Sequence, residues 1–152
     1  MGAVFFYHLT RDPVEVTLPM LLGRAREAGW RVLVRGGDAG RLDWLDQKLW
    51  MGDGFLPHGL AGGPHDADQP VLLTTGAAAP NGAACLMAVD GASVSAEEAG
   101  AMERVCILFD GNDPAAVEAA RGQWRDLTSA GVSAQYWSQD GGRWQKKAES
   151  GA

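Results

Sequence analysis

Short apolar runs alternate along this chain with segments in which apolar residues recur every three or four positions. The runs are rich in β-branched and aromatic residues, which is typical of strands covered on both faces. They predict strands at 4–8, 31–34, 71–73, 85–89 and 105–109, and an alternating edge strand at 132–137. The periodic segments predict helices at 16–28 and 114–130, one that carries Leu42, Leu45 and Leu49, and a short one from Ser95.

This alternation of strands and helices predicts an α/β fold, with a mostly parallel sheet and helices on both faces. Residues at the predicted helix starts agree with it. Asp38 can cap the second helix, and Ser95 with Glu98 can form a capping box. Asn112 or Asp113 can cap the last helix.

The length and composition indicate one globular domain. The chain has 152 residues, of which 46% are hydrophobic, enough for a sizeable core. We assign residues 1–145 to this domain and expect 146–152 to form a disordered tail. No apolar run is long enough for a membrane span, and we find no signal peptide, so we expect a cytoplasmic location. Cys85 and Cys106 lie in apolar strands, which favours buried free thiols, although a bridge between them stays possible.

Charge is distributed unevenly. The net charge is −6, which disfavours direct binding of nucleic acid. Between 121 and 147, however, five basic residues face only Asp126 and Asp140, a local charge of +3. Such a patch suggests an acidic partner, and the alternative is a solvated helix end. The basic residues are Arg121, Arg125, Arg143, Lys146 and Lys147.

We find no catalytic constellation in the sequence, because no nucleophile, base and orienting group occur in a known spacing. His58 is interpreted as a hydrogen-bonded loop residue that fixes the turn after Pro57. Asp90 and Asp110 end strands, where they can be catalytic acids, but Asp is favoured in turns and we expect turn formers. The predicted class is a non-catalytic protein.

Cofactor and metal sites are weakly indicated. The glycine-rich turn Gly36–Gly40 could cradle a phosphate, which keeps a small nucleotide-binding or hydrolytic α/β protein as the alternative function. It lacks the spacing of known nucleotide motifs, so we expect no cofactor. Since a stable metal site needs several converging ligands, we interpret His65, Asp66 and Asp68 as solvated loop residues and expect no metal.

A loop at 49–62 carries two large rings, Trp50 and Phe55, among four glycines and Pro57. Breakers of this density indicate irregular structure, which usually runs over the surface. Large surface aromatics often anchor a partner. The alternative is that both rings fold back onto the core.

This loop also carries a resemblance. Leu49-Trp50 followed by Phe55-Leu56-Pro57-His58-Gly59-Leu60-Ala61-Gly62 resembles the motif of the chi subunit of the bacterial DNA polymerase III holoenzyme. The resemblance extends over most of the chain and is strongest over 1–62. The further matching segments are Val4–Leu9, Gly29–Val34, Arg41–Trp50, Ala120-Arg121, Trp124-Arg125 and Ala130-Gly131.

The resemblance implies a Rossmann-like fold and a replisome adaptor rather than an enzyme. It implies binding of the acidic C-terminal tail of single-stranded DNA-binding protein by Arg121, Trp124 and Arg125. Trp124 also lies on the helix stripe that should meet the sheet, so core and site remain open for it.

The resemblance implies a second surface as well. Trp50 and Phe55, with Leu56 and Pro57, would bind the psi subunit or another partner. The chain departs from familiar members in two places. Val117 replaces a lysine one turn before Arg121, and the spacer between Trp50 and Phe55 is two residues shorter.

Overall fold

The computed structural model describes residues 3–51, 57–76, 79–140 and 143–150. Eight strands form one sheet in the order β3-β4-β2-β5-β6-β1-β7-β8. The strands are β1 (Ala3–Leu9), β2 (Val32–Gly36), β3 (Gly59–Leu60), β4 (Val71–Thr74), β5 (Cys85–Val89), β6 (Arg104–Asp110), β7 (Ala134–Asp140) and β8 (Arg143–Ser150). The α-helices are α1 (Val14–Glu27), α2 (Ala39–Trp50), α3 (Ala96–Ala101) and α4 (Pro114–Ser129), with a 3-10 turn at Asp66–Asp68.

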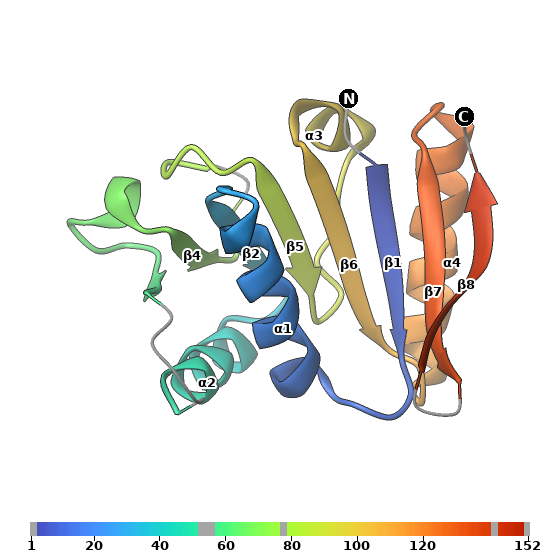
Figure 1. Ribbon diagram of the computed structural model, residues 1–152, viewed down its shortest axis with the longest axis horizontal. Coiled ribbons are helices and arrows are strands. Elements are labelled where there is room, and N and C mark those ends of the chain that lie inside the picture. The colour runs from blue at the N-terminus through green and yellow to red at the C-terminus, as the bar shows by residue number, and fades with distance from the viewer. Residues whose placement is uncertain (1–2, 52–56, 77–78, 141–142, 151–152) are drawn as a thin grey trace.

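All neighbouring strands are parallel except β7 and β8, which confirms the predicted α/β class. In Figure 1, α1 and α2 lie in front of the sheet and α4 lies behind it. Each face therefore carries its own hydrophobic core, as a buried parallel sheet requires.

Successive side chains along the central strands belong alternately to the two cores. Val32 and Val34 of β2 point to the face covered by α1 and α2, whereas Leu33 points to the face of α3 and α4. Phe6 is fully buried on the α4 face. Because successive side chains of a strand alternate, a continuous apolar run supplies both cores.

The predicted helix starts are confirmed. The Asp38 side chain accepts from the Gly40 N–H, and Ser95 and Glu98 form a capping box. Of the two candidates for α4, Asp113 is the cap. These local signals hold because the capping side chains satisfy N–H groups that a helix leaves without partners.

The C-terminal end differs from the sequence prediction. The expected disorder from Lys146 is wrong over 146–150, which continue β8, and the segment at 132–137 is not the edge of the sheet. Trp144 anchors β8, because its ring meets Tyr7 edge-on at a centroid distance of 5.3 Å. The rest of β8 is mostly polar and exposed, a usual composition for an edge strand and the reason that it resembles a tail in sequence.

Candidate functional site

Arg121, Trp124 and Arg125 lie close together on α4, and we call these three residues the α4 surface. Both arginines are exposed, and Trp124 between them is half-buried. Arg121 and Arg125 are one helical turn apart, so their side chains emerge from the same side of the helix. The structure thus brings these three predicted residues into one region.

Trp124 is both a core residue and a surface residue. Its ring meets Phe6 at 5.4 Å and Tyr136 at 6.1 Å, in both cases edge-on. These contacts attach α4 to β1 and β7, while part of Trp124 remains accessible to solvent. The core interpretation of Trp124 is confirmed for the packed part of the ring, and its role as a binding residue stays a prediction.

Tyr136 of β7 belongs to the same region and was not singled out in the sequence. Its hydroxyl lies 2.7 Å from Nδ1 of His8, whose Nε2 lies 3.4 Å from the backbone oxygen of Gly111. Burial raises the pKa of Tyr136, and the charge of Arg121 acts in the opposite direction. Because its ring contacts that of Trp124, Tyr136 borders the α4 surface.

The two arginines differ in their partners. Nη2 of Arg125 lies 3.8 Å from Oε1 of Glu118, and both side chains are about two-thirds exposed (65% and 68%). An exposed pair at this distance is weak. For Arg121 the described part of the chain offers no side-chain hydrogen bond or ion pair, so its guanidinium is available to a ligand.

The predicted basic patch is divided by the sheet. Lys146 pairs with Trp137 in the β7–β8 register, and Tyr136 pairs with Ala148. Directly paired residues share a face, and Tyr136 is on the α4 face. The next residue, Trp137, points to the opposite face. Its partner Lys146 therefore lies on that opposite face, where it pairs with Glu149 at 3.3 Å. The charge of +3 is not concentrated on one surface.

The second predicted surface is partly described. Trp50, at the end of α2, is 53% exposed, so it does not fold fully into the core. Its ring lies over the ring of His58, with centroids 4.1 Å apart. Pro57 is exposed, whereas Phe55 and Leu56 lie outside the described residues. Met51, the next residue in the chain, and Leu60 of β3 are also exposed, at 75% and 37%.

The ring of His58, on which Trp50 packs, is fixed by contacts to α2. It is buried, and its Nε2 lies 3.2 Å from the backbone oxygen of Asp46 and 3.2 Å from Oδ1 of the same residue. The interpretation of His58 as a hydrogen-bonded loop residue is confirmed. The contact joins the loop to α2 and holds a flat base under the exposed indole.

The glycines of the Gly36–Gly40 turn have a packing role. A Cβ on Gly37 would overlap the backbone oxygen of Asp90, and one on Gly36 would come within 2.9 Å of the Leu42 side chain. The first N–H groups of α2 face the Asp38 carboxylate, which already accepts from the Gly40 N–H at 3.3 Å. A phosphate at this position would meet a carboxylate, so the nucleotide alternative gains no support.

The strand-ending aspartates are turn formers, as expected. Asp90 has a positive φ of 51° and continues into Gly91, whose φ is also positive. The Asp110 carboxylate accepts from the Asn112 N–H at 2.9 Å. Cys85 and Cys106 are buried and free. A hydrogen bond with Cys85 and burial raise the pKa of Cys106, so this thiol stays protonated.

These observations define an α/β domain with two exposed aromatic surfaces, an arrangement that suits binding of other proteins. The sequence model of the family described as DNA polymerase III chi subunit, HolC, matches residues 1–135. The chain belongs to this family, and the resemblance noted in the sequence is confirmed. Its role is accordingly that of an accessory protein of DNA polymerase III in DNA replication.

A search among curated proteins gives no match. The matched residues include all of the α4 surface and Trp50, and they end before β8. Within the described residues, no helix combines the length and the apolar character that crossing a membrane requires.

Proposed function

We propose that this protein is a non-catalytic adaptor that binds the acidic C-terminal tail of single-stranded DNA-binding protein through the α4 surface. The observation that carries the proposal is an exposed Arg121 beside a half-buried Trp124. A planar guanidinium can hold a terminal carboxylate through two hydrogen bonds, and an apolar ring of the tail can pack on the accessible part of the indole.

The remaining parts of the α4 surface suit the same ligand. Tyr136 borders the indole and is held in place by His8, so the apolar part of the site is rigid before the ligand arrives. Arg125 can exchange its exposed contact with Glu118 for an aspartate of the tail. Val117 contributes no charge, so Arg121 and Arg125 carry the electrostatic attraction.

A second contact with the polymerase assembly is proposed at Trp50. An exposed indole followed by the exposed Met51 can be covered by a psi-like subunit or another protein, because large aromatics dominate such interfaces. This surface lies at the end of α2 and is distinct from α4. A protein with two separate surfaces can join two partners. We propose that it does so in the cytoplasm, without a cofactor and without binding nucleic acid directly.

The test is a fluorescence anisotropy titration with a labelled peptide that copies the acidic tail. Arg121→Ala and Arg125→Ala should each weaken binding, by about 1–3 kcal/mol where a charged hydrogen bond is lost. Arg24→Ala is the matched control, since Arg24 is an exposed helical arginine on α1. Binding should also weaken with added salt. Absence of saturable binding, or an equal loss with Arg24→Ala, would contradict the proposal.

A further inference from the structure

A cleft of about 720 Å³ opens at the carboxyl edge of the sheet, away from both surfaces described above. The ends of β1, β5 and β6 form its base, and the first turns of α1 and α4 form its sides. Crevices at this edge of an open parallel sheet are where α/β folds bind ligands. Arg121, Trp124 and Trp50 do not line it.

The base and one wall of the cleft are apolar and small. Leu9, Ile107, Leu108 and Phe109 form the base. The wall belongs to α4 and consists mainly of alanines. Because alanine side chains are short, they leave open a space that larger residues would fill. The alanines are Ala115, Ala116, Ala119 and Ala120.

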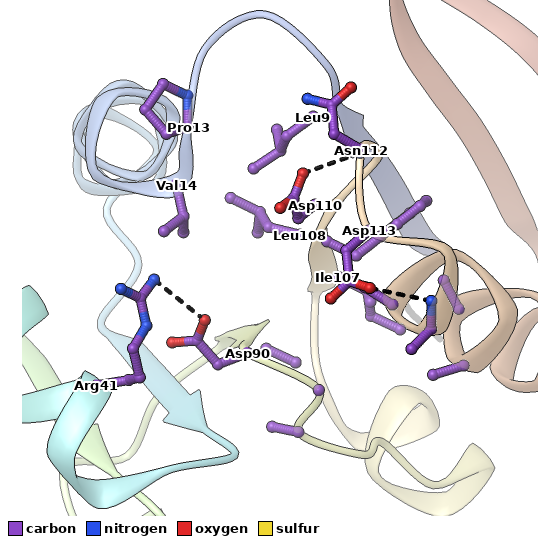
Figure 2. A pocket seen from close by; sticks show the side chains of 18 of the residues that line it. Leu9, Pro13, Val14, Arg41, Asp90, Ile107, Leu108, Asp110, Asn112 and Asp113 are labelled. Atoms are coloured by element: carbon purple, nitrogen blue, oxygen red, sulfur yellow. Dashed lines mark hydrogen bonds and ion pairs between the residues drawn. The ribbon is translucent and has the colours of Figure 1, made fainter.

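The rim of the cleft is acidic. Six carboxylates line it against two guanidiniums, those of Arg11 and Arg41. Figure 2 shows Asp90 on one side of the opening and Asp110 and Asp113 on the other. The six carboxylates are those of Asp12, Glu15, Asp38, Asp90, Asp110 and Asp113.

Most of this negative charge is not neutralised inside the protein. Asp90 is paired with Arg41, 3.4 Å away. Asp12 and Asp110 instead accept from neutral groups, the side-chain amide of Gln139 and the backbone N–H of Asn112. A neutral donor satisfies hydrogen bonding without cancelling the charge, so the rim attracts cations.

The helix ends at the cleft reinforce this preference. Helix N-termini usually attract anions, but Asp38 and Asp113 already cap α2 and α4 with their own carboxylates. The first turn of α1 carries Glu15. A phosphate or an acidic peptide would therefore meet carboxylates at each of these helices. The rim excludes anions and favours a positively charged occupant.

We propose that the cleft binds a basic segment of a partner protein, an extended stretch in which lysine or arginine flanks an apolar side chain. The apolar side chain occupies the space beside the alanine wall, over Ile107 and Phe109, and the flanking cations contact the rim carboxylates. Charge complementarity identifies this occupant, and the apolar base distinguishes it from a simple polycation. The site accepts charge opposite to that accepted by the α4 surface, so the two do not compete for one ligand.

The experiment titrates the full chain with a short fluorescein-labelled peptide of alternating lysine and leucine. The same peptide with glutamate in place of lysine is the negative probe, and spermidine is added as a competitor that carries charge alone. Glu15→Gln combined with Asp110→Asn removes two rim charges, and the new amide at 110 can still accept from Asn112. Ala119→Phe fills the cleft without changing charge.

Glu97→Gln combined with Glu103→Gln is the matched control, because both carboxylates are exposed and lie outside the cleft. Thermal melts of every variant establish that it is folded. The rim variant should weaken binding about threefold to tenfold, the range expected for the loss of two exposed charge contacts. Ala119→Phe should also weaken binding, because its ring occupies the space of the apolar side chain, and the control should not.

Three results would overturn the proposal. The lysine–leucine peptide fails to bind, the control weakens binding as much as the rim variant, or spermidine displaces the peptide at equal concentration. Arg121→Ala should leave this binding unchanged, so the outcome is independent of the test of the α4 surface.

Discussion

Replacing Glu118 by glutamine should tighten binding of the acidic tail, because the Glu118 carboxylate repels that ligand and competes with it for Arg125. Glu118 and Arg125 form the exposed ion pair on α4, with Nη2 and Oε1 3.8 Å apart. A tail carboxylate that binds Arg125 must displace Glu118. It must also approach the negative charge of Glu118, which lies beside the Arg125 guanidinium and repels the tail carboxylate.

The magnitude follows from the exposure of the pair. Both side chains are about two-thirds exposed (65% and 68%), and pairs of this kind contribute about 0–1 kcal/mol. Removing the competition should therefore tighten binding by up to about fivefold, the factor that corresponds to 1 kcal/mol. The gain should shrink as salt is added, because both the competition and the repulsion are screened.

The assay is the anisotropy titration with the tail peptide, applied to Glu118→Gln, Arg125→Ala and the double variant. Glu118→Gln should bind the peptide more tightly than wild type. The affinity of the double variant should be closer to that of Arg125→Ala than to that of Glu118→Gln. Unchanged or weaker binding by Glu118→Gln, in a protein whose Arg125→Ala variant does lose affinity, would refute the reasoning. The ion pair would then not limit access to Arg125.

Two further predictions concern stability. Hydrogen bonds from the buried Arg35 lower the pKa of Glu98 from its ordinary 4.5. The contribution of the ionised Glu98 to the free energy of unfolding is therefore complete above pH 4.5 and is lost as pH falls through the pKa of the folded state. Urea unfolding should therefore show Glu98→Gln costing about 1–3 kcal/mol at neutral pH, the range for a charged hydrogen bond at a partly exposed carboxylate, and less in acid. An equal cost at both pH values would contradict this prediction. Gly111→Ala should cost about 1–3 kcal/mol, because its Cβ would overlap the His8 ring, whereas Gly23→Ala on α1, with open space around it, should be neutral or stabilising.

The local elements were predictable from the sequence. The apolar runs and the spacing of leucines predicted the central strands and α-helices, and Asp38, Ser95 and Asp113 predicted helix starts. These features depend on side-chain periodicity and on hydrogen bonds within a few residues, so the information lies in adjacent positions. The motif around Trp50 and the matches near Arg121 also identified the family from sequence.

The α4 surface was predicted in part. Arg121, Trp124 and Arg125 lie on one helix, so their proximity follows from helical spacing. Tyr136 and His8 complete the surface from two strands that are 128 residues apart in the chain. No local pattern marks that contact, because the parallel pairing of β1 with β7 brings these two side chains together.

The chain by itself determined the α/β class, the helix starts, the family and the arginines of α4, since each is encoded by neighbouring residues. The tertiary structure decided three other features: the β8 strand, the separation of Lys146 from the α4 face, and the acidic rim of the cleft. The first two depend on the β7–β8 register, which assigns each side chain to a face. The rim depends on parallel topology, which gathers Asp12, Asp90 and Asp110 at one edge because all the strands that precede them end there.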